Sequence, residues 1–293
     1  MPTTEVADTS SREQLRGLDK LELALPQRRS RASRIWYVVW PKVAAVALFF
    51  FIWQCIVWSG WKADYLLPGP ITVLDKLFGD FGTYFDAAVL TLGRALKGFA
   101  LAIAIGTVLG ALVARISLLR RAVGSMITGL MTMPSIAWFP LAILLFGLTE
   151  GSITFVVILG AAPSVANGLI SGIDNIPPIM LRTGRVLGAE GIATFRHVIF
   201  PAALPTFVGG IKQGWAFAWR SLLAGELLVV IPGTFSLGLR LQSAADQVDA
   251  AGVMAAMMVI FFIGVVMDAL VFSNAERVIR KRYGLIDEAA ATR

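Results

Sequence analysis

The sequence predicts an all-α, polytopic membrane protein with six transmembrane helices and both termini in the cytoplasm. Of its 293 residues, 57% are hydrophobic and only 15% carry a charge, whereas about a quarter of the residues of a soluble globular protein are charged. The apolar residues also gather into six successive segments. Each is close to the roughly 20 residues with which a helix crosses a hydrocarbon core of about 30 Å.

The six apolar segments are separated by connections that carry most of the charged residues. The segments cover approximately residues 43–58, 96–116, 123–148, 153–173, 204–231 and 253–272. In the second segment, Gly106 and Gly110 are four residues apart and share a helix face, which favours the close approach of another helix. Pro134 and Pro140 interrupt the third segment, and we expect prolines to kink it there.

Charge in the connections gives the orientation. The N-terminal tail, the second and fourth connections and the C-terminal end are basic, while the first connection, 62–86, holds four aspartates against two lysines. Because Lys and Arg collect in cytoplasmic loops, both termini are predicted to be cytoplasmic. Arg94 and Lys97 are the one feature against this alternation. The predicted domains are a cytoplasmic tail (1–40), a transmembrane domain (41–275) and a second cytoplasmic tail (276–293).

Composition argues against several classes of function. The net charge of +7 is explained by the cytoplasmic connections, so we expect no nucleic-acid partner. Cys55 is the only cysteine and His197 the only histidine, which leaves little for a metal site, a catalytic triad or an integral-membrane enzyme. An ion-coupled secondary transporter is the alternative class, although the sequence shows little of the broken helices and ionisable chains that ion coupling needs.

The fourth connection, about 174–201, is too long for a simple turn. Pro178 suits the first turn of a short helix, and Gly188 is expected to break that helix by taking the left-handed conformation. A second amphipathic piece follows over 190–200, which Pro201 is expected to end, and Pro205 then opens the fifth membrane helix. The pattern fits a knob that projects into the cytoplasm, or else an amphipathic linker lying on the membrane surface.

This connection resembles the cytoplasmic EAA loop of ABC importer permeases. Gly188 matches that loop's glycine, and Val198 and Pro201 match its apolar residue and its proline. Arg182, Thr183 and Gly184 stand where the family has Glu-Ala-Ala. The resemblance implies that the residues coupling the chain to an ATPase are Arg182, Thr183, Gly184, Gly188, Ala189, Glu190, Val198 and Pro201.

Three further stretches resemble the branch of that family that contains the nitrate, sulfonate and taurine permeases. They are Leu67-Pro68-Gly69-Pro70, then Met133-Pro134-Ser135-Ile136-Ala137-Trp138-Phe139-Pro140-Leu141 with Phe146-Gly147 and Glu150, and finally Trp219 with Glu226. Together with the loop, the resemblance covers about residues 65–275. It implies the fold of a type I ABC importer permease in the bacterial inner membrane.

The resemblance also implies a set of partners. They are a dimer of ATPase subunits, an extracytoplasmic solute-binding protein and a second permease copy, which for this branch is expected to be identical. The sequence itself lacks the Gly-x-x-x-x-Gly-Lys-Ser/Thr motif that cradles phosphates. We therefore expect no enzymatic activity and no cofactor in this chain, with ATP bound by the partner. The implied solute is a small anion of the sulfonate, taurine or nitrate type.

Four residues are candidates for the translocation pathway: Pro134, Trp138, Arg220 and Glu226. Charges inside a membrane are costly and suggest function, so Arg220 is expected to attract an anionic solute, or else to reach the interface or neutralise a carboxylate on a neighbouring helix. For Glu226 a gating or packing role fits better than solute binding, because a carboxylate repels an anion. Trp138 lies in the proline-bounded stretch, where the alternative is core packing. Lys212 and Asp268 are expected to reach interfacial water.

Overall fold

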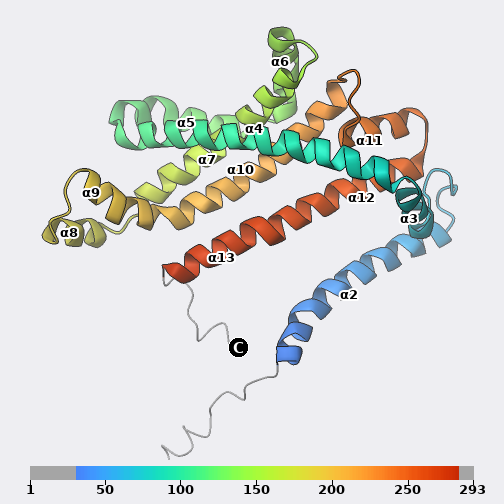
Figure 1. Ribbon diagram of the computed structural model, residues 1–293, viewed down its shortest axis with the longest axis horizontal. Helices are drawn as coiled ribbons and strands as arrows, with labels where there is room; N and C mark the ends of the chain where they lie inside the picture. Colours follow the sequence, from blue (N-terminus) through green and yellow to red (C-terminus); the bar gives the residue numbers. More distant parts are fainter. Residues whose placement is uncertain (1–30, 284–293) are drawn as a thin grey trace, which may run out of the picture. The chain divides into compact units, whose positions relative to one another are not determined.

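The computed structural model describes residues 31–283, and every regular element in that range is helical (Figure 1). The chain forms two units, Met1–Ser59 and Gly60–Arg293, and each is described by itself. The described part of the first unit is one helix, α2 (Arg31–Trp58), which contains Pro41. Its 39–58 stretch is long and apolar enough to cross a membrane.

The second unit contains the rest of the helices. The chain enters it through α3 (Pro70–Gly79), α4 (Phe81–Arg115), α5 (Ser117–Thr132), η1 (Ser135–Trp138), α6 (Phe139–Phe146) and α7 (Glu150–Asp174). It continues through α8 (Pro178–Val186), α9 (Ile192–Thr194), η2 (Phe195–Ile199), α10 (Phe200–Leu228) and α11 (Leu237–Asp246). The last elements are α12 (Ala250–Val266), η3 (Met267–Phe272) and α13 (Ser273–Arg282).

The expected all-α membrane fold is confirmed. Five helices are long and apolar enough to span a membrane, and a sixth span results if the bent pair formed by 117–132 and 135–146 counts as one. That third span is not the continuous kinked helix expected, because its two halves make an angle of 106°. The break falls at Met133, whose backbone is extended, since a residue before proline is disfavoured in the helical conformation. Pro140 lies in the first turn of α6 instead.

Several membrane helices are longer than their apolar segments. The second begins at Phe81, so α3 and the start of α4 occupy the stretch expected to be a connection. The last runs without interruption over 250–282. Hydropathy detects only the part of a helix that crosses the hydrocarbon core, and the backbone continues helical beyond it because intrahelical hydrogen bonds satisfy its polar groups.

Glycines of α4 hold this helix tightly against α7. A Cβ atom at Gly106 would lie 2.6 Å from the carbonyl oxygen of Ala162, and one at Gly110 would lie 2.9 Å from that of Ala166. These distances are shorter than any side chain tolerates, so the small residues set the separation of the two helices. The expected close helix approach at this pair is therefore confirmed.

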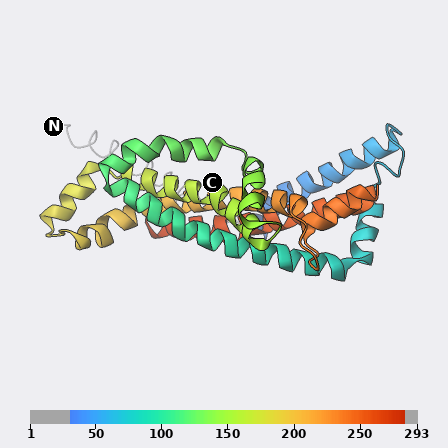
Figure 2. The ribbon, with the colours of Figure 1, turned by 90° about the horizontal axis from the view of Figure 1, so that it is seen from above.

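The opposite side of α7 packs in the same way against α10, so that α7 is the central helix of the second unit (Figure 2). A Cβ atom at Gly168 would lie 2.6 Å from the Cα atom of Gly210. One turn further on, a Cβ atom at Gly172 would lie 2.7 Å from the carbonyl oxygen of Ala203. The two backbones are therefore in direct contact along this stretch.

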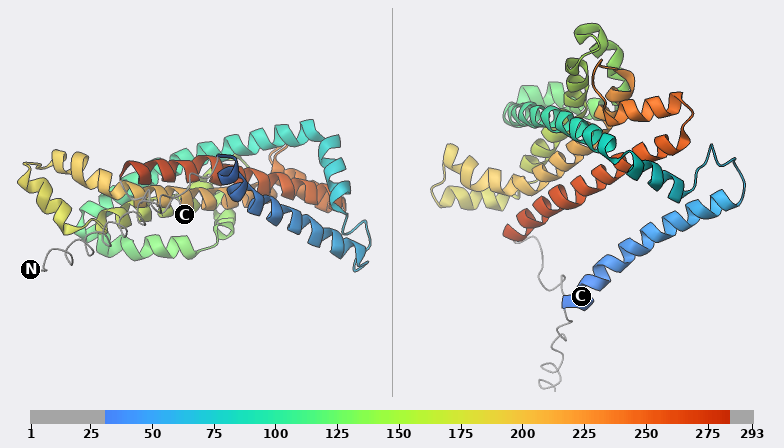
Figure 3. Two further views of the ribbon diagram at one scale, coloured as in Figure 1. Left: turned by 90° about the horizontal axis from the view of Figure 1, so that it is seen from below. Right: turned by 45° about the vertical axis from the view of Figure 1, so that its right-hand side comes forward.

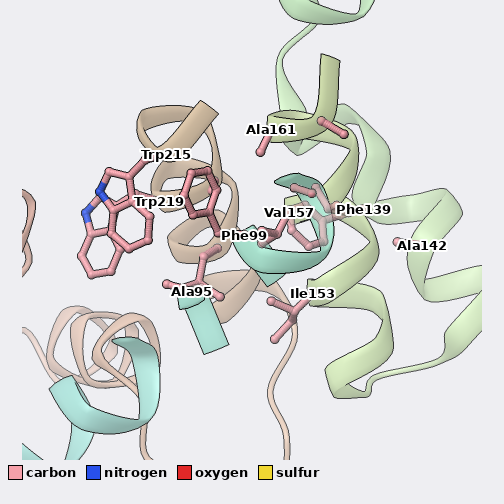
Figure 4. Packing of buried hydrophobic residues seen from close by; sticks show 14 of the residues in the cluster. Ala95, Phe99, Phe139, Ala142, Ile153, Val157, Ala161, Trp215 and Trp219 are labelled. Carbon is pink, nitrogen blue, oxygen red and sulfur yellow. The ribbon is translucent and has the colours of Figure 1, made fainter. Parts of the chain in front are cut away.

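Larger apolar side chains fill the interface away from the glycines (Figure 4). Phe99 of α4 packs edge-on against Trp215 of α10, with ring centroids 5.3 Å apart, and Trp215 stacks on Trp219. Phe139 of α6 is buried and lies against Gly225. The broken third span is thus anchored to the bundle by its second half.

The end of the second unit opposite α8 and α9 is closed by α3, α11 and the start of α12 (Figure 3). The Lys76 ammonium lies 3.3 Å from the Asp249 carboxylate, which also accepts a hydrogen bond from the N–H of Gly252 and so caps α12. That hydrogen bond and the lysine hold the pKa of Asp249 below its ordinary value. The same pairing raises the pKa of Lys76. Lys76 and Asp249 therefore fasten α3 to α12.

The glycine contact between α7 and α10 yields a stability prediction. We expect Gly210→Ala to force the two helices apart and to lower the free energy of unfolding by about 1–3 kcal/mol, the usual range for overpacking. Gly209→Ala is the matched control, because a Cβ atom there meets nothing within 4 Å and alanine favours the helix by up to about 1 kcal/mol. Thermal unfolding of the purified chain measures both. Equal midpoints for the two variants would contradict this view of the interface.

Candidate functional site

The predicted coupling loop, residues 174–201, begins with the short helix expected there. Pro178 is the first residue of α8, which ends at Val186. Gly188 has a φ angle of +80°, and its N–H donates to the carbonyl oxygen of Arg185 at 3.0 Å. The expected left-handed glycine is confirmed, and its conformation turns the chain back toward the membrane helices.

The remaining loop residues fall into an inner and an outer group. Gly184 is buried, and a Cβ atom there would lie 2.8 Å from Cγ2 of Val198, so this pair closes the loop on itself. The N–H of Ala189 donates to the carbonyl oxygen of Gly184, and the Thr194 hydroxyl donates to that of Ala189. The outer group is exposed and consists of Arg182, Thr183, Gly188 and Glu190.

The tip of the loop presents large aliphatic side chains to its surroundings. Val186 is 86% exposed, Leu187 79% and Ile192 85%. Contiguous exposed apolar residues of this kind mark surfaces that bind another protein or a membrane. Figure 1 shows α8 and α9 at one end of the bundle, away from α3 and α11.

The second half of the loop corrects one expectation. Pro201 does not end the amphipathic piece, and Pro205 does not open a separate helix, because 192–228 forms one continuous helix. Proline has no N–H and normally breaks the ladder of helical bonds. Here the helix widens into a π-helix, η2, in which the N–H of Phe200 donates to the carbonyl oxygen of Phe195. The wider turn lets the helix pass the proline.

Three charged side chains meet inside the membrane domain where α4, α7 and α10 come together. Nη1 of Arg94 lies 3.0 Å from Oε1 of Glu226, and its Nε donates to the Glu150 carboxylate at 2.9 Å. The side chains of Glu226 and Arg94 are 0% and 7% exposed, while that of Glu150 is 53% exposed. Arg94, Glu150 and Glu226 are called the charge network below.

Neutral donors complete the charge network. The Thr91 hydroxyl lies 3.0 Å from both oxygens of Glu226, and the N–H of Gly238 donates to Oε2 at 3.0 Å. The Thr91 hydroxyl oxygen in turn accepts a hydrogen bond from the N–H of Leu237. The Arg94 guanidinium also donates a hydrogen bond to the hydroxyl oxygen of Thr234. A fully buried carboxylate needs this many donors to be stable. The segment that leads into α11 is thereby fixed to α4.

The charge network accounts for Arg94 and shows the surroundings of Glu226, for which a gating or packing role was expected. Arg94 was an exception to the charge alternation, and the structure buries it between two carboxylates. Glu226 is fully buried and not open to a solute. The signal was available, since Arg94 is a cation inside an apolar helix and two glutamates lie at the ends of other apolar helices. Intramembrane charges are expected to pair.

Arg220 lies on a different face of α10 and has a different environment. Its Nε donates to the carbonyl oxygen of Ala216 at 3.1 Å, and its guanidinium lies 4.9 Å from the ring centroid of Phe217. Within residues 60–283 it forms no ion pair. It also lines a cavity of about 650 Å³ between α10 and α12, together with Trp219, Leu223 and Phe261.

The exposed face of α10 is polar or small between its two end residues, Phe200 and Leu228, which are themselves exposed and apolar. Between residues 201 and 227 its exposed positions follow each other at intervals of three or four: Thr206, Gly209, Gln213, Ala216 and Arg220. These five residues are called the α10 stripe. By contrast, exposed positions of α4 carry large aliphatic side chains such as Leu101, Ile105 and Val108, as a lipid-facing surface requires. The α10 stripe therefore lacks the large apolar side chains that are typical of a lipid-facing surface.

The other candidate residues are not gathered with Arg220. Trp138 is half-buried and packs against the central apolar cluster. Pro134 is exposed at the break of the third span. Asp268 lines the same cavity as Arg220 but is neutralised by Lys212, whose Nζ lies 3.0 Å away. Both side chains of this ion pair stay partly exposed, and the expectation that Lys212 and Asp268 reach interfacial water stays a prediction.

Comparison with known proteins defines the class. Residues 102–280, more than half of the chain, match the family of binding-protein-dependent transport system inner membrane components. The chain also resembles the MetNI methionine ABC transporter in inward-facing conformations, with a TM-score of 0.58 and 17% identity over 69% of this chain and 98% of that one. A second likeness, to an amino acid ABC transporter with histidines, has a TM-score of 0.52 at 19% identity and covers 71% of this chain and 97% of that one. The fold is that of a type I ABC importer permease.

Sequence relatives place the chain within that class. It is 28% identical over 233 residues to a putative ABC transporter permease of Methanocaldococcus jannaschii, covering 78% of this chain and 86% of the relative. It is 25% identical over 258 residues to the nitrate import permease NrtB of Synechocystis (83% and 92%). It is also 25% identical over 233 residues to the taurine transport permease TauC of Escherichia coli (77% and 84%).

The chain belongs to the binding-protein-dependent permease family and is an ABC importer permease subunit of the inner membrane. The branch indicated by the sequence motifs, which contains nitrate and taurine permeases, is confirmed. The family also argues against the alternative of an ion-coupled secondary transporter.

The charge network predicts a strong effect of removing its cation. We expect Arg94→Met to destabilise the chain by about 3–5 kcal/mol, because it leaves Glu226 buried without its partner. Adding Glu226→Gln to that variant removes the uncompensated charge and should recover part of the loss. Thermal unfolding in detergent measures the effect. Lys97→Met, which removes an exposed cation one turn along α4, is the control and should unfold like the wild type.

Proposed function

We propose that this permease is the gate of an ATP-driven importer and that two copies enclose the pathway of a small anionic solute, of the sulfonate, taurine or nitrate type. The observation that carries the proposal is Arg220, an exposed cation on a membrane helix that has no carboxylate partner within residues 60–283. Because such a charge is costly in lipid, it requires water, a partner subunit or an anion. A pathway between two subunits supplies water and an anion.

The composition of the α10 stripe supports a pathway that runs along this face of α10. A helix face of threonine, glycine, glutamine, alanine and arginine is suited to a second subunit or to an aqueous passage. The hydroxyl of Thr206 and the amide of Gln213 offer hydrogen bonds to a hydrated solute. In a symmetric pair of identical subunits, the two stripes would face each other across the twofold axis.

The charged residues near the cavity support a negatively charged solute. Two ionisable residues line the cavity: Asp268 is neutralised by Lys212, and Arg220 retains a net positive charge. The guanidinium fork matches planar or tetrahedral oxyanions, to which it donates two parallel hydrogen bonds. The nitrate and taurine permeases among the relatives carry solutes with such groups, and a sulfonate-type anion is our first choice.

The coupling loop is proposed to receive the motion of the ATPase dimer. Its exposed apolar tip at Val186, Leu187 and Ile192 is suited to a groove on that partner. The hydrolysis of ATP is assigned to the partner, because this chain carries no phosphate-cradling sequence. The solute is proposed to arrive from an extracytoplasmic binding protein, as the family description indicates.

The pathway role of Arg220 is tested by uptake. We expect Arg220→Met to lower the rate of anion uptake about tenfold or more, the loss that follows when a charge-assisted hydrogen bond is removed. The measurement is uptake of labelled taurine, an alkanesulfonate and nitrate into cells that express the importer at matched levels. Lys97→Met is the control, because it removes another exposed membrane cation that lines neither the cavity nor the α10 stripe. Unchanged uptake by Arg220→Met would end the pathway assignment.

The coupling role of the loop is tested at Gly188. We expect Gly188→Val to abolish both co-purification with the ATPase and uptake, because valine is strained at a φ angle of +80°. A Cβ atom there meets nothing within 4 Å, so the folded membrane domain should be retained, as its thermal midpoint would show. Gly124→Val is the control, since it also adds side-chain volume in open space. Uptake that survives loss of the ATPase would instead favour an ion-coupled transporter.

A further inference from the structure

A second cavity of about 650 Å³ lies at the end of the bundle where α4 and α7 finish, next to the coupling loop. The last turns of α4 and α7 form two of its walls, with Ala111 and Ala114 on one side and Leu169 and Ile173 on the other. The two alanines leave space that larger side chains would occupy. A volume of this size is enough for a molecule of several hundred daltons.

The third wall comes from the return of the coupling loop. Gly191, with a φ angle of +53°, turns the chain so that α9 and η2 face the ends of α4 and α7. Phe195 and Ile199 of η2 both line the cavity. Residues four apart on a helix share a face, so both side chains point to the same side. The widened helix therefore closes the cavity with apolar side chains.

One charged residue stands at this otherwise apolar cavity. Arg115, the last residue of α4, lines it, is exposed and forms no ion pair within residues 60–283. The neighbouring Arg120 is already paired with Asp174. The other polar side chain of the lining, Thr194, donates its hydroxyl hydrogen to the carbonyl oxygen of Ala189. Arg115 is thus the charged group of this cavity that is available to a ligand, and the walls beside it are apolar.

We propose that this cavity binds one anionic phospholipid, with its phosphate at Arg115 and part of an acyl chain between Ala111, Leu169 and Phe195. The depth is appropriate, since α4 and α7 are long and apolar enough to span a membrane, and Arg115 stands at the end of the apolar segment of α4, the level at which headgroups are expected. Basic pockets between membrane helices at this level attract anionic headgroups. A free anionic metabolite would find few hydrogen-bonding partners on the apolar walls, whereas an acyl chain needs none.

The bound lipid would brace the coupling loop. Phe195 and Ile199 contact it from η2, and the Thr194 hydroxyl joins the same segment to the Ala189 carbonyl, next to the left-handed Gly188. A filled cavity holds α9 against the ends of α4 and α7, and an empty one leaves it unsupported. This consequence for coupling rests on the proposed function, whereas lipid binding itself does not.

The experiment measures lipid retention. The full-length permease, expressed with its ATPase partner, is purified from membranes containing phosphatidylglycerol and phosphatidylcholine, and bound lipid is counted by native mass spectrometry during delipidation. We expect the wild type to retain one phosphatidylglycerol per permease. We expect Arg115→Gln to retain about tenfold less, which is the loss expected for one charge-assisted contact. Arg121→Gln is the control, since Arg121 is exposed in the same connection and does not line the cavity.

Two further arms separate the alternatives. Ala114→Phe fills the cavity while Arg115 remains, and we expect it to release the lipid as Arg115→Gln does. Glycerol phosphate is added to the delipidated protein, and we expect no rise in its thermal midpoint, in contrast to a short-chain phosphatidylglycerol. Equal retention by Arg115→Gln and wild type, or equal loss in Arg121→Gln, would overturn the site. Full protection by glycerol phosphate would show a site for free phosphates and overturn the lipid assignment.

Discussion

The energetic cost of an unpaired charge in a membrane governs the arrangement of this permease. Arg94 is almost completely buried and is neutralised by two carboxylates. It thereby joins α4 to α7 and α10 at one end of the bundle. Lys212 is neutralised by an ion pair with Asp268. Arg220 has no such partner within the described part of the second unit, and it lies on a face without large apolar side chains. Arg94 and Lys212 thus stabilise the fold through carboxylate partners, whereas the charge of Arg220 stays unpaired in that part of the chain.

Close packing along α7 joins this helix firmly to both α4 and α10. Gly106 and Gly110 bring α4 against one side of α7, and Gly168 with Gly210 brings α10 against the other. Backbones in direct contact leave no gap that could absorb a displacement, because the helix separation is fixed by the atoms themselves. In the proposed cycle, a shift of α7 at the coupling loop would therefore be passed to both neighbours. The charge network, at the far end of the same three helices, defines the point at which they stay together.

Much of the fold follows from the sequence, because hydropathy, glycine spacing and proline chemistry act locally. The apolar segments predicted the membrane spans, Gly106 and Gly110 predicted a close helix contact, and Gly188 predicted the left-handed turn. What could not be predicted depends on relations between distant elements. The pairing of Arg94 with Glu226 joins residues 132 positions apart, and no local pattern specifies that distance. The sharp bend of the third span and the passage of α10 through Pro201 depend likewise on neighbouring packing that compensates lost hydrogen bonds.

The passage through Pro201 matters most for mechanism. Had the chain broken there, the coupling loop would be a separate element, attached to the membrane domain by a hinge. Instead one helix of 37 residues begins inside the loop at Ile192, carries the α10 stripe with Arg220, and ends beside Glu226. In the proposed cycle, a rotation of the loop by the ATPase turns Arg220 directly, while the charge network holds the far end. The π-helix at the base of this helix also lines the cavity proposed to bind a lipid. The proposed lipid site and the proposed solute pathway are thus connected by a single helix.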